Sequence, residues 1–306
     1  MERAMGWVEN LKRFGLQGTV DLNSERVGPI GAGQLGNLLA HNTTVENLDL
    51  RETILGPEGA RHVARMLMSN TTLVTLDLTS NSVEDEGATA LAHALKGNSK
   101  LALVKLELQR NGISADGARE LADALRHNTS IQYLGLAFNG FGDAGAAYVA
   151  QVLSGSNRWL RHLDLGFNGV CAQGACALAT GLRGNAVLET LELGYNGISD
   201  AGVQALAGAV QVNTVLTSLG LPSNGISDEG VNELVVALRD NRYMHVHNQL
   251  HEHTLVHTHR QTDRQTHTHT HRHRHTHTHT HTHTHTHTHT HTQVTAACGA
   301  VCESHW

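Results

Sequence analysis

Residues 103–125 read LVKLELQRNGISADGARELADAL, and this stretch decides the fold because versions of it recur along residues 16–241. The copies begin, at spacings of 28, 30, 28, 29, 28 and 28 residues, at Val45, Leu73, Leu103, Ile131, Leu160, Leu188 and Leu216. A degenerate copy around Val20 precedes them and brings the number to eight. A fixed period of this size predicts a solenoid, in which each copy stacks on its neighbours.

Each copy changes its hydrophobic period halfway along. The leucines of LVKLEL include an alternating pair, which predicts a short strand. The helical period follows Gly117, with small or leucine residues at Ala118, Leu121, Ala122 and Leu125. Strands lie about 4.8 Å apart and packed helices about 8–10 Å apart. The sequence therefore predicts an α/β solenoid that curves, with a parallel sheet on its concave side and helices on its convex side.

Polar residues mark the expected helix starts. Serine hydroxyls can cap exposed backbone N–H groups, and acidic side chains suit the positive end of a helix. The candidate caps are Ser114, Ser199 and Ser227, and the candidate acids are Asp85, Asp143, Asp200 and Asp228. We expect these residues to be structural.

An asparagine follows most of the predicted strands, where its amide is expected to bond backbone groups as the chain turns. Glu25 and Thr53 replace it in the first two copies, which predicts a less regular N-terminal edge. The matching asparagines are Asn81, Asn111, Asn139, Asn168, Asn196 and Asn224.

With this asparagine, the repeat resembles the ribonuclease-inhibitor-like subfamily of leucine-rich repeat proteins, and it is similar to the repeat region of CARD-containing NOD-like receptors. The resemblance implies a horseshoe-shaped module that binds a protein partner, in an innate-immune or signalling scaffold. It implies no ribonuclease binding, because only Cys171 and Cys176 lie within these repeats and the inhibitor is rich in cysteine. Ran GTPase-activating proteins carry similar repeats, so regulation of a small GTPase is a second hypothesis.

Composition and motifs narrow the classes of function. Residues 1–244 hold 18 basic against 25 acidic residues, which argues against nucleic acid and favours a protein partner with a basic or neutral surface. We expect a cytoplasmic protein that does not bind membranes, because neither a secretory signal nor a long apolar run occurs. No HExxH, GxSxG or GxxxxGK[ST] motif is present, so we expect neither an enzyme nor a cofactor. Glycosylation sequons at Asn42, Asn70 and Asn128 share one repeat position, which favours a structural role.

The sequence divides into three segments. Residues 1–19 are expected to form a capping helix, 20–241 the repeat domain, and 242–306 a disordered tail. Histidine and threonine alternate over most of 267–292, so the tail is expected to bind divalent transition metals adventitiously. Metal binding by this tail is a third hypothesis, without a predicted metal site.

Acidic residues share one variable position of the strand and are expected to form a column on the concave face. A cationic partner would relieve their mutual repulsion, whereas the alternative is an ordinary solvated face of this repeat type. The column comprises Asp21, Asp49, Asp77, Glu107, Asp164 and Glu192, interrupted by Gly135 and Gly220.

Aromatic residues precede the asparagine in three neighbouring repeats. An exposed aromatic group beside acids suits a binding site, whereas the alternative is that each ring packs on its neighbour within the loops. These residues are Phe138, Phe167 and Tyr195, and the adjacent candidates are Tyr133, Arg161 and His162. The predicted partner-binding set joins these six to Asp77, Glu107, Asp164 and Glu192.

Overall fold

The computed structural model describes residues 16–241 and 243–247, in which strands and helices alternate. The strands are β1 (Gly18–Asp21), β2 (Val45–Asp49), β3 (Thr75–Asp77), β4 (Lys105–Glu107), β5 (Tyr133–Gly135), β6 (His162–Asp164), β7 (Thr190–Glu192), β8 (Ser218–Gly220) and β9 (His245–His247). The helices are α2 (Gly28–Leu39), α3 (Gly56–Leu67), α4 (Glu84–Gly97), α5 (Ala115–Leu125), α6 (Gly142–Gln151), α7 (Ala172–Arg183), α8 (Ser199–Val210) and α9 (Asp228–Asp240), with a short turn of wider helix at η2 (Val152–Ser156).

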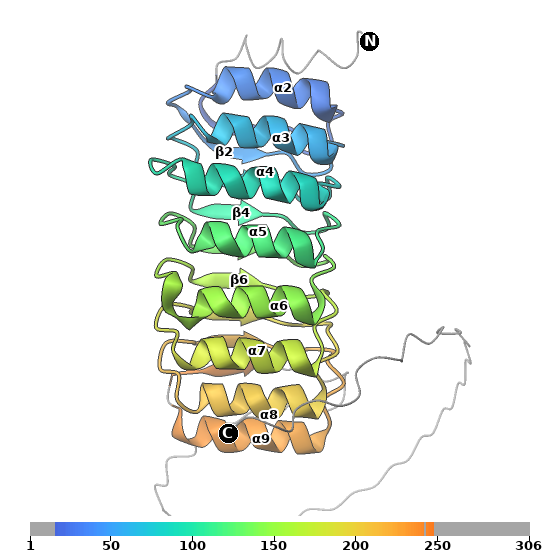
Figure 1. The fold of residues 1–306 in the computed structure, drawn as a ribbon, viewed down its shortest axis with the longest axis vertical. Coiled ribbons are helices and arrows are strands. Elements are labelled where there is room, and N and C mark those ends of the chain that lie inside the picture. The colour runs from blue at the N-terminus through green and yellow to red at the C-terminus, as the bar shows by residue number, and fades with distance from the viewer. Residues whose placement is uncertain (1–15, 242, 248–306) are drawn as a thin grey trace, which may run out of the picture.

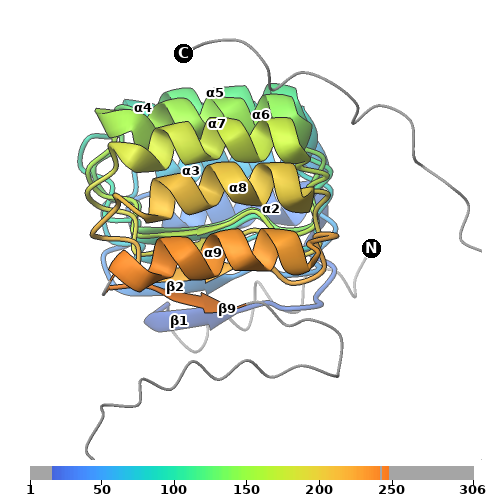
Figure 2. The same ribbon diagram turned by 90° about the horizontal axis from the view of Figure 1, so that it is seen from below.

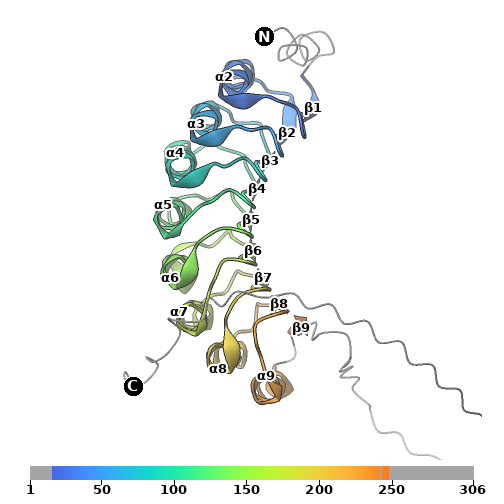
Figure 3. The same ribbon diagram turned by 90° about the vertical axis from the view of Figure 1, so that its right-hand side faces the viewer.

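The strands form one parallel sheet in chain order from β1 to β9. The helices stack in the same order (Figure 1) and all lie on one side of the sheet (Figure 2). Figure 3 shows the arc in profile, with the strands along its inner side and the helices along its outer side. The predicted α/β solenoid is therefore confirmed.

The core lies between the two layers. Leu106 and Leu108 of the β4 repeat are fully buried, as are Leu121 and Ala122 of the facing helix apart from about two per cent of their surface. The same positions are buried in the other repeats, except that Val235 of the last repeat is half-buried, and the buried residues form one continuous apolar cluster along the solenoid. The two periods seen in the sequence thus correspond to the two faces of this core.

The asparagines of the third to eighth repeats bond backbone groups where the chain leaves the strand, as predicted, and they also link neighbouring repeats. Asn81 donates to the carbonyl oxygens of Leu50 (2.6 Å) and Leu78 (3.0 Å), and its own oxygen accepts the N–H groups of Thr53 and Leu55. Thr53 does part of this task in its repeat, because its buried hydroxyl donates to the Leu50 carbonyl at 2.6 Å. The expected irregularity of the N-terminal edge is seen in a register shift between β1 and β2.

A second asparagine series lies where the helices end. Asn70 is almost fully buried, donates to the Leu39 carbonyl at 2.7 Å and accepts the N–H of Leu73 at 2.8 Å. Asn128 is also buried and donates to the Leu95 carbonyl. Both amides are engaged in the fold, which supports the structural reading of these sequons.

Two of the three predicted serine caps are confirmed. The hydroxyls of Ser114 and Ser227 accept the N–H groups of Asp116 and Glu229 at the starts of α5 and α9. The prediction for Ser199 is wrong: it is the first residue of α8, with a φ of 56°, and its side chain caps nothing. Its N–H instead donates to the Asn224 carbonyl.

Three of the four predicted acids at the helix starts bond the start of the helix in the following repeat. Asp85 accepts the N–H groups of Ser114 (2.7 Å) and Gly117 (3.0 Å) at the start of α5. A side chain at Gly117 would prevent this approach, because an added Cβ would lie 2.6 Å from the carboxylate. Asp143 and Asp200 make equivalent bonds to α7 and α9. From α4 to α9, helices whose start is bonded by an acid of the preceding repeat (α5, α7 and α9) therefore alternate with helices that lack this bond (α4, α6 and α8). The asparagine pattern of the sequence did not predict this alternation.

The two ends of the chain lie largely outside the described residues. The predicted capping helix lies mainly within residues 1–15, and the histidine–threonine tail within 248–306, both outside the described residues. Strand β9 falls in the range predicted to be tail and pairs with β8. No helix within 16–241 and 243–247 is long and apolar enough to cross a membrane.

Candidate functional site

Parallel register brings the acidic positions side by side on the concave face. Asp49 pairs with Asp77, Asp77 with Glu107, and Asp164 with Glu192. We call the series the acidic row; it consists of Asp21, Asp49, Asp77, Glu107, Asp164 and Glu192. The predicted column therefore exists as a spatial feature.

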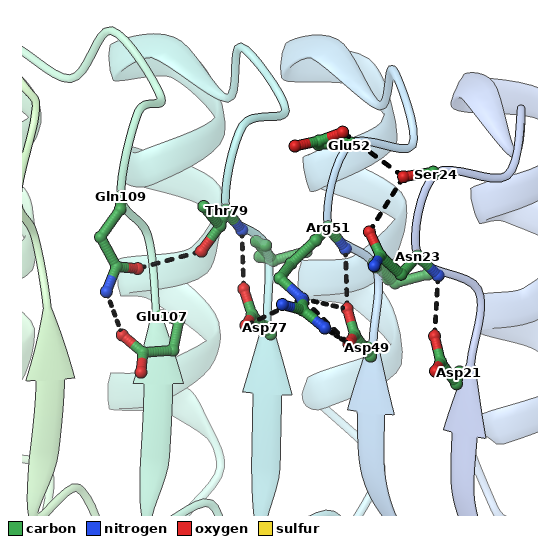
Figure 4. Close-up of polar contacts among 12 residues, drawn as sticks. Asp21, Asn23, Ser24, Asp49, Arg51, Glu52, Asp77, Thr79, Glu107 and Gln109 are labelled. Carbon is green, nitrogen blue, oxygen red and sulfur yellow. Dashed lines mark hydrogen bonds and ion pairs between the residues drawn. The ribbon is translucent and has the colours of Figure 1, made fainter.

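The aspartates of the acidic row have a structural task at the end of each strand. The carboxylate of Asp77 accepts the N–H of Thr79 at 2.9 Å, and Asp164 accepts that of Gly166 at 2.9 Å. Asp21 and Asp49 make the same bond to the residue two positions on (Figure 4). This local turn explains part of the preference for aspartate.

Arg51 neutralises the N-terminal part of the acidic row. Its guanidinium lies 2.5 Å from the Asp49 carboxylate and 3.5 Å from that of Asp77 (Figure 4). Burial raises the pKa of Asp49, but the hydrogen bonds from Arg51 outweigh it and leave the pKa below its ordinary value. The predicted repulsion is thus relieved here by the chain itself.

Glu107 is less accessible than predicted. It is 7% exposed, accepts a bond from Gln109 at 2.5 Å, and pairs with Lys105 at 2.9 Å. Its carboxylate lies where a side chain at Gly135 would be, and Glu192 lies likewise against Gly220. The glycines that interrupt the column therefore make room for the longer glutamates, and Glu107 offers a partner little surface.

Tyr133 lies in the middle of the concave face, within the field of the acidic row. Its ring centroid is 5.9 Å from that of His162, and the Lys105 ammonium lies 4.6 Å from it. Burial raises the pKa of Tyr133 to about 12, with further contributions from Glu107, Asp164 and other acids of the row. Two predicted site residues, Tyr133 and His162, are thus brought together with the acids.

Arg161 is engaged within the protein. Its guanidinium forms an ion pair with Glu189 of the next repeat, and both side chains are more than one third exposed. The pair lies beside His162 at the start of the strands. Arg161 is thus on the predicted face, with its charge offset by a neighbour.

Phe138, Phe167 and Tyr195 form a continuous stack, which we call the ring stack. The centroids are 3.9 Å apart for the first pair and 4.0 Å for the second, with interplanar angles of 13° and 11°. All three residues have left-handed backbone conformations, with φ between 54° and 57°. The rings pack on their neighbours and also stay exposed, at 38%, 38% and 52%. Packing within the loops and availability to a partner are therefore compatible.

Three cations of this face were missed as site residues. Arg110 lies over Phe138, 4.2 Å from its centroid, and thus ends the ring stack on one side. Arg51 and Lys105 neutralise parts of the acidic row. Their positions in the repeat could have identified them in the sequence. Arg110 occupies the repeat position of the rings, and Arg51 and Lys105 each lie two residues from an acid of the row.

The described residues form neither a disulfide nor a cluster of metal ligands. Cys171 and Cys176 are partly exposed and form no disulfide. Within the part of the chain that the structure describes, no group of three or more His, Cys, Asp or Glu residues is placed to hold a metal ion.

Comparison with known proteins identifies the repeats. Residues 18–144 match the family model described as the TMOD/LMOD leucine-rich domain, and residues 156–179, 184–207 and 212–235 match a leucine-rich repeat model. The chain therefore carries leucine-rich repeats along most of its solenoid.

Two solved structures are similar to this chain at low identity. One is titled leiomodin-1 actin-binding site 2, with 14% identity, coverage of 60% of this chain and 88% of that one, and a TM-score of 0.38. The other is the tropomodulin C-terminal domain of Caenorhabditis elegans, with 17% identity, coverage of 60% and 92%, and a TM-score of 0.38. A search of curated proteins finds no match.

Proposed function

We propose that this chain is a non-enzymatic protein-interaction module whose concave face binds a partner with basic or neutral surface chemistry. The contact area comprises the ring stack, Tyr133, His162 and the acids Asp77, Asp164 and Glu192 of the acidic row. The observation that carries the proposal is the ring stack itself, in which three neighbouring rings remain 38% to 52% exposed, each three residues after a position of the acidic row. Aromatic residues on a rigid frame contribute strongly to protein interfaces.

Electrostatics supports a partner that brings positive charge. Several carboxylates of the acidic row raise the pKa of Tyr133, so their fields add at one place on the concave face. Asp164 lies in this region, and burial raises its pKa, which indicates a partly desolvated carboxylate. Bringing a cation to such a group favours association and fixes its register.

The finer assignments are part of the same proposal. The asparagine series and the repeat length support a relation to ribonuclease-inhibitor-like repeats and to the repeat region of NOD-like receptors. On that relation, the module serves in a cytoplasmic signalling or innate-immune scaffold. Stimulation of GTP hydrolysis by a small GTPase would instead favour the regulatory alternative.

The test is affinity capture with a charge-neutralised concave face. The triple variant D77N/D164N/E192Q removes three charges while its amides can still accept hydrogen bonds. The matched control is E58Q/E86Q/D116N, which neutralises three exposed acids of the convex helices. Proteins captured by the wild type and the control should be lost from the concave variant in quantitative mass spectrometry. The same set of captured proteins with all three baits would contradict the proposal.

A further inference from the structure

The two ends of the ring stack differ. At one end Arg110 covers the outer face of Phe138, with its guanidinium carbon 4.2 Å from the ring centroid. At the other end Tyr195 stacks on Phe167 through one face and is 52% exposed. The next repeat places Ser223 at the same position, with a matching φ of 55°, and a serine side chain is too small to cover a ring. No second ring or cation among the described residues lies over Tyr195.

The surface between the ring stack and the acidic row changes along the solenoid. In the second to fourth repeats, the position two residues after the acid carries a long or polar side chain: Arg51, Thr79 and Gln109. Arg51 and Gln109 donate to the carboxylates of Asp49 and Glu107, and the Thr79 hydroxyl donates to the Gln109 side chain (Figure 4). In the fifth to seventh repeats the same position carries Ala137, Gly166 and Gly194. The chain therefore supplies its own cover for the N-terminal acids and only small residues beside Asp164.

The protein itself contains an example of a cation bound to a ring of the stack and an example of a cation bound to the acidic row. Arg110 shows that a guanidinium stacks on this kind of ring, and Arg51 shows that one can bridge two acids of the row. A planar guanidinium stacks on aromatic rings and donates two parallel hydrogen bonds to one carboxylate. An ammonium group stacks less well on a ring and does not match the carboxylate with a rigid pair of donors.

We propose that the exposed face of Tyr195 receives an arginine side chain of the protein partner, and that Asp164 receives a second cation of the same segment. This inference rests on the proposed function and names the chemistry that the site selects. Tyr195 follows Glu192, the neighbour of Asp164 in the acidic row, by three residues, which span at most about 10 Å. Side chains two residues apart on one face of an extended segment lie about 7 Å apart. The length of these side chains covers the difference between this spacing and the separation of Tyr195 from the acidic row. The occupant is therefore an extended segment with cationic side chains at alternate positions, of which the one on Tyr195 is arginine.

The experiment uses the full chain and two fluorescent peptides of equal charge, one of alternating arginine and glycine and one of alternating lysine and glycine. Fluorescence anisotropy should give about three- to tenfold tighter binding of the arginine peptide. The Y195S variant should lose this preference, and Y195F, which keeps a ring, should retain it. D164N should weaken both peptides, whereas the convex control E86Q should change neither. Circular dichroism verifies that each variant is folded.

Equal affinity for the two peptides, or an arginine preference that survives in Y195S, overturns the inference. Neither result contradicts the proposed function as long as D164N weakens binding and the triple concave variant loses captured proteins. Absence of binding by either peptide also overturns the inference, and the capture experiment then decides the proposed function separately.

Discussion

Replacing the middle ring of the stack should cost more stability than replacing the terminal ring. Phe167 has a ring on each face, whereas Tyr195 has a ring on one face. Serine is the suitable replacement because Ser80 and Ser223 occupy the equivalent position with φ values of 59° and 55°. The F167S and Y195S variants therefore remove rings without requiring a new backbone conformation.

The structure sets the size of the effect. Each stacked pair contributes about 0.5–1.5 kcal/mol beyond the apolar area it buries, so F167S loses about 1–3 kcal/mol from its two pairs and Y195S about half of that. Lost burial adds to both, and more to F167S, because Phe167 is 38% exposed and Tyr195 52%. We expect a decrease in unfolding free energy of about 2–4 kcal/mol for F167S and about 1–2 kcal/mol for Y195S.

Urea unfolding followed by circular dichroism measures both values. The control is T79S, which shortens a side chain at the same loop of an earlier repeat without touching a ring, and it should stay close to the wild type. Equal losses from F167S and Y195S would refute the reasoning, because the second stacked pair of Phe167 would then add nothing. No loss from either variant would show that the stack contributes no packing energy.

Three further predictions concern the frame around the site. D85A should lower the unfolding free energy by about 2–4 kcal/mol, because the backbone N–H groups of Ser114 and Gly117 lose a charged acceptor. The control D116A, which removes an exposed acid of the same helix start, should cost less than about 0.5 kcal/mol. Similar losses in urea unfolding of both variants would contradict the stabilisation of α5 by Asp85. G135A should destabilise the fold by displacing the Glu107 carboxylate, and the shorter side chain of E107D should restore part of the loss; an additive double variant would argue against this coupling. Tyr133 has a folded pKa raised to about 12, so its contribution to stability is complete below about pH 10 and is lost as the pH rises through 12. Absorbance titration against Y133F should show one tyrosine that ionises late, and an ordinary pKa for Tyr133 would contradict the burial seen here.

The architecture was predictable because its determinants repeat along the chain. The alternation in LVKLEL and the period after Gly117 are local patterns, and both report burial directly. The asparagine after the strand was predictable for the same reason, since one side chain at a fixed place satisfies the turn in the third to eighth repeats.

What the sequence concealed depends on contacts between repeats. The bond from Asp85 to the next helix spans 29 residues, and its signal is spread over an acid, a serine and a glycine. The role of Arg51 was missed and the burial of Glu107 was not foreseen, because a position alone does not show how far a long side chain reaches toward its neighbours. Strand β9 escaped notice because its histidine-rich composition resembles that of the residues that follow it.

Site-specific photo-crosslinking tests the central claim most directly, because it reports which face the partner touches. A photoreactive phenylalanine analogue would replace His162 on the concave face in one protein and Glu86 on the convex helices in another. If the partner binds the concave face, we expect it to crosslink from residue 162 and not from residue 86. Crosslinking from residue 86 alone, or equally from both residues, would contradict binding on the concave face.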